Sequence, residues 1–288
     1  MKKTFLLIAS ALLSLAAGAQ TVDVHKTDGT TVSYPASDVS YIGFTAGGGD
    51  PTTPGTAPAG AAAIDLGLPS GTKWANMNVG ATTPEGYGLY FAWGETVGYG
   101  SDTSDGRSFD WASYKWCNGS YDTQTKYCTV SSYGTVDNKT VLDLEDDAAY
   151  VNWGAKWRMP TITEIQELLN NTTSEWTTQN GVYGRKFTSK SNGNSVFLPA
   201  AGYRYGSYVG SQASYGYYWS SSLIESLSSY ARDLYFDSGD QCANSAAATA
   251  GLPFAPCSEI SASFPSDATR DPNMRENPTQ AIFACAGC

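Results

Sequence analysis

The chain has 288 residues, with 17 Lys and Arg against 27 Asp and Glu, and a formal net charge of −10. An acidic chain repels nucleic-acid phosphates and anionic membranes, so this composition disfavours nucleic-acid binding. Aromatic residues reach 13% and charged residues only 15%, which indicates a folded, loop-rich protein rather than a disordered one. The single histidine, His25, excludes a Ser-His-Asp triad and a histidine-bearing zinc cluster from the rest of the chain.

Residues 1–19 have the pattern of a secretory signal peptide. Lys2 and Lys3 precede the apolar stretch 5–17, and residues 17–19 (Ala-Gly-Ala) form a small-x-small cleavage pattern. The alternative is a buried helix. No later stretch is apolar enough to cross a bilayer. We therefore expect an exported protein without a transmembrane segment, either secreted, periplasmic or at the cell surface.

Two short regions follow the leader. Residues 20–45 predict a small β unit, because apolar residues alternate with polar ones on both sides of Asp28-Gly29, a hairpin turn signal. A third short strand is expected within residues 39–44. Residues 46–63 are rich in Gly, Pro, Thr and Ala, cannot bury a core, and predict a flexible linker before the main domain at 64–240.

The main domain contains two helix signals followed by strand signals. The first helix is expected at 143–153, with acids in its first turn. The second follows Pro160, where Thr161 is a good N-cap and Glu164 sits at capping-box distance. Strands are expected at residues 196–198, 215–219 and 231–236. Helices before strands favour an α+β class with an antiparallel sheet.

The stretch 146–164 ends in Trp157-Arg158-Met159-Pro160-Thr161 and, three residues later, Glu164. It resembles the helix and W-R-[LM]-P-T-x-x-E motif of the Fibrobacter succinogenes major paralogous domain family. Other matching pieces, in the family's order, are 65–75 (DLGLPSGTKWA), 78–81 (NVGA), 90–95 (YFAWGE), 197–204 (FLPAAGYR) and 218–222 (YWSSS).

This resemblance implies a C-type-lectin-like fold, with two helices on a twisted antiparallel sheet and long loops. The family is bacterial, secreted or surface-associated, and has no established general activity. The same motif is distantly similar to one in formylglycine-generating enzymes, which need two copper-binding cysteines late in the fold. Cys117 and Cys128 lie upstream of the motif, so we expect no enzyme activity. The motif itself is interpreted as structural, and its residues are Trp157, Arg158, Pro160, Thr161 and Glu164.

Four acids, Asp143, Glu145, Asp146 and Asp147, raise the question of a calcium site, because hard cations bind clustered oxygens. The simpler interpretation is a charged first helical turn. The E-P-N, Q-P-D and W-N-D tripeptides that C-type lectins use for calcium-bridged sugar binding are absent from the sequence. We expect no metal and no cofactor.

Cys117 and Cys128 are the only cysteines in residues 64–240, and export would permit a disulfide between them. Such a bridge would close a loop of about a dozen residues and contribute about 3 kcal/mol through loop entropy. Two free buried thiols are the alternative. We predict the bridge.

The feature of the sequence that most strongly suggests a ligand-binding surface is a group of tyrosines among Gly and Ser residues. Exposed Tyr and Trp supply rigid contact area, and flat rings stack on sugar faces. The competing interpretation places Trp219 and alternate tyrosines in the core. The tentative ligand-binding residues are Tyr203, Tyr205, Tyr208, Tyr215, Tyr217 and Trp219.

The sequence therefore predicts a non-catalytic domain that binds a surface glycan or a surface protein through aromatic loops. The alternative function is a structural or adhesive surface component without a discrete ligand site. An enzyme similar to formylglycine-generating enzymes is the third hypothesis.

Residues 241–288 differ in character from the rest of the chain. They contain four of the six cysteines and show neither alternation nor a helical stripe. The family resemblance leads us to expect a terminal core strand reading S-V-R-P-V, which these residues lack. Codons compatible with residues 246–257, read from their third base, can spell such a strand. We therefore interpret 241–288 as an atypical tail from an out-of-frame translation, and expect it to be poorly packed.

Overall fold

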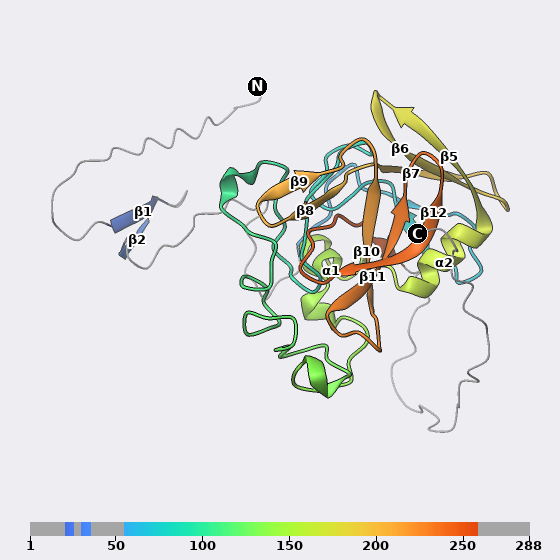
Figure 1. Ribbon diagram of the computed structural model, residues 1–288. Coiled ribbons are helices and arrows are strands. Elements are labelled where there is room, and N and C mark those ends of the chain that lie inside the picture. The colour runs from blue at the N-terminus through green and yellow to red at the C-terminus, as the bar shows by residue number, and fades with distance from the viewer. Residues whose placement is uncertain (1–20, 26–29, 36–54, 259–288) are drawn as a thin grey trace, which may run out of the picture. The chain divides into compact units, whose positions relative to one another are not determined.

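The computed structural model describes residues 21–25, 30–35 and 55–258 (Figure 1). The chain divides into two compact units, 1–45 and 46–288. In the first unit, β1 (Thr21–His25) pairs antiparallel with β2 (Thr31–Pro35), as the alternation predicted. The leader at 1–19 and the third expected strand lie outside the described residues.

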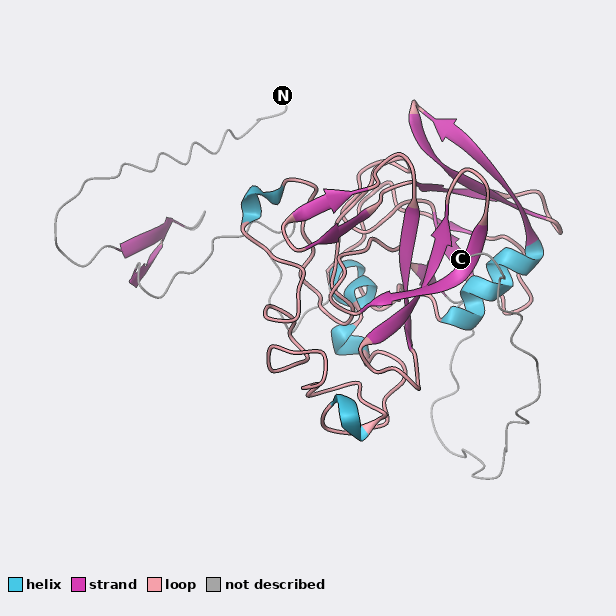
Figure 2. Ribbon diagram, viewed as in Figure 1, coloured by secondary structure: helices cyan, strands magenta, loops and turns pink. Residues whose placement is uncertain are grey.

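The second unit is a mixed α+β structure built from small antiparallel sheets and few helices (Figure 2). Two three-stranded sheets, in the order β5-β6-β7 and β10-β11-β12, provide its main framework. A third sheet has the order β13-β4-β3, and β8 and β9 form a hairpin. The strands are β3 (Ala63–Ile64), β4 (Lys73–Ala75), β5 (Thr172–Gln179), β6 (Val182–Ser189), β7 (Ser195–Pro199), β8 (Tyr203–Tyr205), β9 (Tyr208–Gly210), β10 (Gly216–Leu223), β11 (Tyr230–Phe236), β12 (Gln241–Ala247) and β13 (Cys257–Ser258).

The second predicted helix forms as expected. It is α2 (Ile162–Asn171), and the Thr161 side chain and Glu164 make the complete capping box. The first helix is shorter than predicted. Residues Leu144–Asp146 form a 3₁₀ turn, η4, and α1 (Ala148–Trp153) begins after Asp147, whose carboxylate accepts the N–H groups of the first helical turn. Two further 3₁₀ turns are η2 (Thr103–Asp105) and η3 (Ser131–Tyr133).

The core holds the two main sheets together. Phe187 of β6 packs edge-on against Phe236 of β11, with ring centroids 6.2 Å apart. On α2, Ile165 and Leu168 are buried in the same cluster. This contact fixes the hairpin β5–β6 beside the end of the β10–β11–β12 sheet. A second cluster, formed largely by the long loops before α2, contains Trp219.

Residues 55–63 belong to this unit, whereas the sequence placed them in the linker. Gly55 donates its N–H to the carbonyl of Val151 at 2.7 Å, and β3 starts at Ala63. A Cβ on Gly55 would lie 2.2 Å from the carbonyl oxygen of Asn152, so glycine permits this close approach. Within the described residues, no helix is long and apolar enough to cross a membrane.

Residues 241–258 contradict the expectation of a poorly packed tail. The strand β12 pairs with β11 along its whole length, and residues 248–258 are all buried. Cys257 pairs with Trp74 of β4 and bridges to Arg158. This placement counts against an out-of-frame origin for 241–258. Residues 259–288 lie outside the described residues.

The prolines explain why this segment looked like a tail. Pro253 accepts a hydrogen bond from the N–H of Trp219 at 3.0 Å, and Pro256 accepts one from Ala75 at 2.8 Å. Proline lacks an N–H but keeps its carbonyl, so it fits a core segment that acts as an acceptor. Residues 253–257 (PFAPC) supply the terminal core segment themselves, with proline in the fourth place of the expected S-V-R-P-V pattern.

Candidate functional site

The acidic turn, Asp143, Glu145 and Asp146, has ligand oxygens within 4.8 Å of one another. The ammonium of Lys126 lies among them, 2.7 Å from Asp143, 3.6 Å from Glu145 and 2.5 Å from Asp146. Hydrogen bonds from Lys126 come first among the causes that lower the pKa of Asp143. The chain therefore supplies its own cation to these carboxylates, as the interpretation without metal requires.

Within the Arg158 motif, Arg158 and Glu164 form an ion pair. Two guanidinium nitrogens of Arg158 lie 2.5 and 2.7 Å from the Glu164 carboxylate, which also accepts from the Thr72 hydroxyl at 2.7 Å. Burial alone would raise the pKa of Glu164, but these bonds and the Thr161 N–H hold it at about 2. Pro160 and Trp157 are buried beside the pair. Every oxygen of Glu164 is engaged, so the group stabilises the start of α2.

The predicted Cys117–Cys128 bridge is wrong in this structure, where both thiols are free. Cys117 Sγ lies 3.1 Å from the carbonyl of Trp111, and Cys128 Sγ lies 3.2 Å from the carbonyl of Val130. Each thiol thus donates to a carbonyl near it in the chain. Burial raises the pKa of the Cys117 thiol, which makes it a poor nucleophile.

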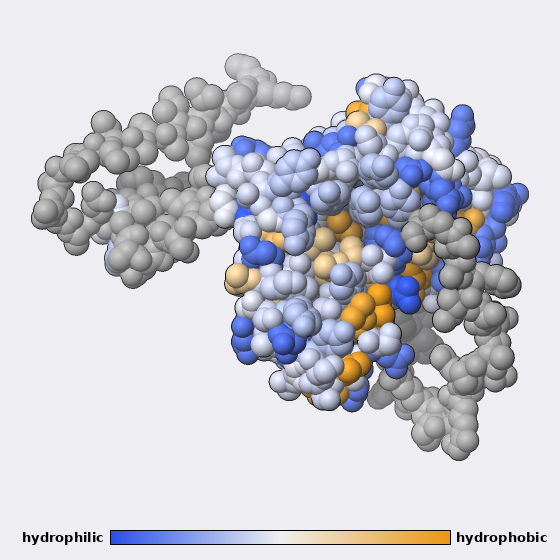
Figure 3. Space-filling view, in the orientation of Figure 1, coloured by the Kyte–Doolittle hydropathy of each residue, from blue (hydrophilic) through white to orange (hydrophobic). Residues whose placement is uncertain are grey.

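The predicted aromatic residues separate into three groups. Trp219 is fully buried and donates its indole N–H to the carbonyl of Phe91 at 2.8 Å, so it is a core residue and its assignment to the ligand site is wrong. Tyr205 and Tyr208 are 62% and 63% exposed and face each other at the tip of the β8–β9 hairpin. The face of the second unit drawn in Figure 3 is mostly polar, with small patches of apolar residues.

The third group is an aromatic cluster on the β10–β11 sheet. Tyr217, half-buried, lies between Tyr203, Tyr215 and Tyr235, with centroid distances of 5.7, 6.2 and 5.2 Å. Burial raises the pKa of Tyr217 to about 12, so its hydroxyl stays protonated. Of the six predicted residues, Tyr215 alone lines a pocket among those described.

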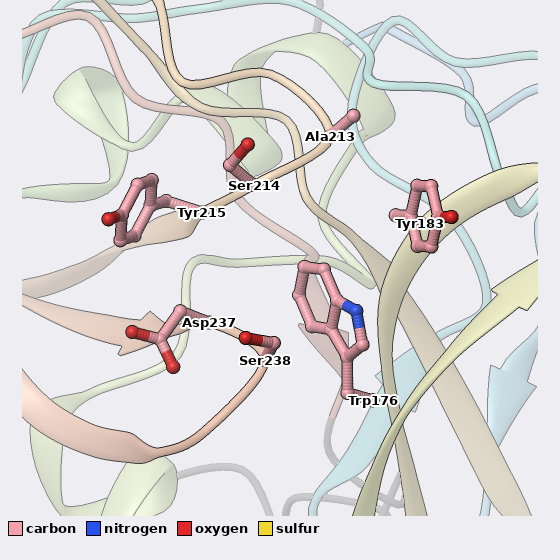
Figure 4. Close-up of a pocket in the computed structure, with 7 residues that line it drawn as sticks. All are labelled: Trp176, Tyr183, Ala213, Ser214, Tyr215, Asp237 and Ser238. Carbon is pink, nitrogen blue, oxygen red and sulfur yellow. The ribbon is translucent and has the colours of Figure 1, made fainter.

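This pocket has a volume of about 320 Å³ and lies between the β5–β6 hairpin, the loop before β10 and the turn after β11 (Figure 4). Figure 4 places Trp176 and Tyr183 on one side and Tyr215 with Asp237 on the other. The lining residues are Trp176, Tyr183, Ala213, Ser214, Tyr215, Asp237 and Ser238. We call it the aromatic pocket.

The β5–β6 hairpin positions the two rings on one side. Asn180 and Gly181 both have positive φ, 50° and 83°, which suits the two-residue turn of a twisted hairpin. Trp176 and Tyr183 come from neighbouring strands and share one face, and their rings stack with centroids 6.0 Å apart and planes at 14°. Next to Trp176 in register is Arg185.

Arg185 fixes the hairpin to the turn after β11. Its guanidinium is 5% exposed and donates to Ser174 at 2.9 Å, to the side chain of Gln241, and to the main-chain carbonyl of Asp237 at 2.9 Å. The aromatic pair and Asp237 are therefore held by one buried cation whose two terminal nitrogens are engaged. The pocket is preorganised by this arrangement.

Asp237 carries a fixed carboxylate. Its Oδ1 accepts the N–H groups of Gly239 and Asp240 at 2.7 and 2.8 Å, and its Oδ2 accepts the Tyr235 hydroxyl at 2.7 Å. The Tyr235 bond is the largest cause that lowers the pKa of Asp237, so the group is ionised at neutral pH. Each carboxylate oxygen accepts about two hydrogen bonds, so Oδ2 retains capacity for one more.

The loop before β10 forms the remaining side of the aromatic pocket, and its backbone is strained. Ser211 and Ala213 both have φ of 61°, a left-handed conformation that costs a residue with a Cβ about 1–2 kcal/mol. The loop is held by bonds from Ala213 N–H to the carbonyl of Ala200 at 2.7 Å and from Gly202 N–H to Tyr215 at 2.8 Å. Strain of this kind concentrates at functional sites.

Sequence reasoning missed Trp176, Tyr183 and Asp237. The hairpin signal was available, because Asn180-Gly181 stands between two alternating stretches. No sequence signal places Asp237 beside Trp176, because the two are brought together by packing between separate sheets. Comparisons of the chain with protein-family models, with curated proteins and with solved structures found no match.

Proposed function

We propose that the chain is an exported, non-catalytic binding domain that takes a surface glycan in the aromatic pocket. The order of helices and antiparallel strands supports a C-type-lectin-like domain, similar to the Fibrobacter succinogenes major paralogous domains. The leader pattern at 1–19 supports export. The acidic charge makes nucleic acid a poor ligand.

One observation carries the proposal, the combination of groups in the aromatic pocket. Trp176, Tyr183 and Tyr215 offer flat apolar rings, while Ser214 and Asp237 offer a hydroxyl and a carboxylate. A pyranose has the complementary surface, because its C–H groups form apolar faces and its hydroxyls lie around the edge. A volume of about 320 Å³ is at the lower end of the size of small-molecule sites and suits one or two sugar rings.

Binding in this pocket is independent of calcium. The three acids closest to forming a metal site among the described residues all pair with Lys126. Lys115 and Lys139 add further pairs to Asp146 and Asp143. Sugar recognition through hydrogen bonds and ring stacking therefore persists in a chelator.

The test is a glycan array with the full chain, run with and without EDTA, followed by titration of the strongest glycan. Trp176→Ala and Tyr215→Ala each weaken binding by about 1–3 kcal/mol, because each removes a stacking ring. Tyr230→Ala is the matched control, since Tyr230 and Tyr215 are both 37% exposed and Tyr230 lies outside the pocket.

Folding of each variant is checked by near-UV circular dichroism, and Tyr183→Ala supplies a second test if Trp176→Ala unfolds. Equal binding by Trp176→Ala, Tyr183→Ala and the intact chain would contradict the site. Loss of the array signal in EDTA would contradict the calcium-independent mechanism.

A further inference from the structure

The charges around the aromatic pocket favour one class of sugar. Asp237 is the only residue among those lining the pocket that is charged at neutral pH, and its carboxylate keeps one acceptor position on Oδ2. A further acid, Glu85, accepts a hydrogen bond from the Asn180 side chain at 2.8 Å at the hairpin tip. The described lining residues include no Lys, Arg or His.

Arg185, the cation that contacts Asp237 in the described part of the chain, is unavailable to a ligand. Arg185 is 5% exposed, and its terminal nitrogens already donate to Ser174, Gln241 and the carbonyl of Asp237. A carboxylate on the ligand would therefore face Asp237 without a compensating cation among the lining residues. Like charges at such distances repel, and desolvation would add to the cost.

The rings add to this preference. A cation is attracted to the face of Trp or Tyr, and the pocket is lined by the rings of Trp176, Tyr183 and Tyr215 as well as by Asp237. A ligand that combines a flat pyranose with an ammonium group satisfies the rings and Oδ2 of Asp237 together. The ammonium donates to the open Oδ2 position while the sugar face stacks.

We propose that the aromatic pocket selects amine-bearing pyranosides, that is, sugars with a free amino group, over neutral ones, and rejects sugars that carry a carboxylate. This inference rests on the proposed glycan-binding function and names its ligand class. All-equatorial pyranosides are the best fit, because both of their faces are flat and can lie against a ring.

The experiment compares three tetrasaccharides with the same β-1,4-linked backbone at pH 6: the glucosamine, glucose and glucuronate oligomers. Calorimetric titration of the full chain is expected to rank them in that order, each about fivefold apart, the factor typical of one partly exposed ion pair. Asp237→Asn keeps the turn acceptor for Gly239 and Asp240 but removes the charge, so the three affinities converge to within about twofold.

Asp240→Asn is the matched control. It removes the same unit of charge from the same turn without touching the lining, so the fivefold ranking persists. Equal binding of the three oligomers by the intact chain, an unchanged ranking in Asp237→Asn, or no binding to any of the three would overturn the inference.

The glycan-binding proposal is decided separately, by the loss of array binding in Trp176→Ala. An intact chain that binds glycans through Trp176 but ranks the three oligomers differently refutes only the selectivity for amines.

Discussion

The acidic turn and the aromatic pocket both place carboxylates at the surface, yet they have opposite chemistry. In the acidic turn, Lys126 occupies the space between Asp143 and Asp146. In the pocket, Asp237 is held by hydrogen-bond donors that leave one acceptor position open. A cluster of acids is therefore not a site when the chain already supplies the counter-ion. A single carboxylate can form a binding site when it is held in place and still has room to accept a hydrogen bond.

The largest expected effect comes from removing the internal counter-ion. Lys126→Met leaves Asp146, whose side chain is 3% exposed, with the 3.3 Å pair to Lys115 and the hydrogen bond from the Tyr127 hydroxyl but without its closest cation. We expect a loss of about 3 kcal/mol in unfolding free energy, because a buried carboxylate loses one of its two ammonium partners. Urea denaturation measures the loss.

The same variant sharpens the comparison with a metal site. Millimolar calcium should restore part of the stability of Lys126→Met and leave the intact chain unchanged, since the three acids can then accept a cation. Lys156→Met is the control, because Lys156 is exposed, and it should change stability by less than about 0.5 kcal/mol. Calcium stabilisation of the intact chain would contradict the self-neutralised turn.

The second effect concerns Asp233, a buried acid that makes no ion pair within the described residues. It lies on β11 opposite Asn244, is fully buried, and neither carboxylate oxygen meets hydrogen-bond geometry with the described residues. Burial raises its pKa to about 8, more than Asn244 lowers it. The folded state therefore binds a proton that the unfolded state releases near pH 4.

The direction in which the unfolding free energy changes with pH follows from this difference in proton binding. Between about pH 4 and pH 8 the folded chain holds more protons at Asp233, so the unfolding free energy falls as pH rises through that window. Asp233→Asn should remove this slope and stabilise the protein at pH 8 by about 2–3 kcal/mol. Urea unfolding at pH 5 and pH 8 checks it, with exposed Asp240→Asn as control. An unchanged slope in Asp233→Asn would refute the assignment.

The smallest effect tests the strain in the pocket wall. Ala213 has φ of 61°, so Ala213→Gly should relieve strain and stabilise the protein by about 0.5–1 kcal/mol. Ala112→Gly, at an exposed turn position without positive φ, should destabilise it by a similar amount because glycine gains entropy on unfolding. If both variants shift the urea midpoint in the same direction, the backbone of the pocket loop at Ala213 is not strained.

Local signals in the sequence determined several elements. The Thr161 and Glu164 pair predicted where α2 starts, because a capping box depends on residues three positions apart. The apolar stretches at 231–236 and 196–198 predicted the strands β11 and β7. The motif around Arg158 was interpreted as structural, and in the structure Arg158 makes an ion pair with Glu164 of the same motif.

Tertiary packing decided the rest. Trp219 and Tyr215 look alike in sequence, but Trp219 lies within β10 and is buried with its indole N–H bonded to the carbonyl of Phe91, whereas Tyr215 lies in the loop before β10 and lines the pocket. Residues 253–257 looked like a tail because prolines break the alternation, yet their carbonyls complete the core. Trp176 and Asp237 come together because Phe187 packs on Phe236 and Arg185 bonds the β5–β6 hairpin to the turn after β11. Short-range rules set where elements begin and end, and long-range contacts chose which side chains form a site.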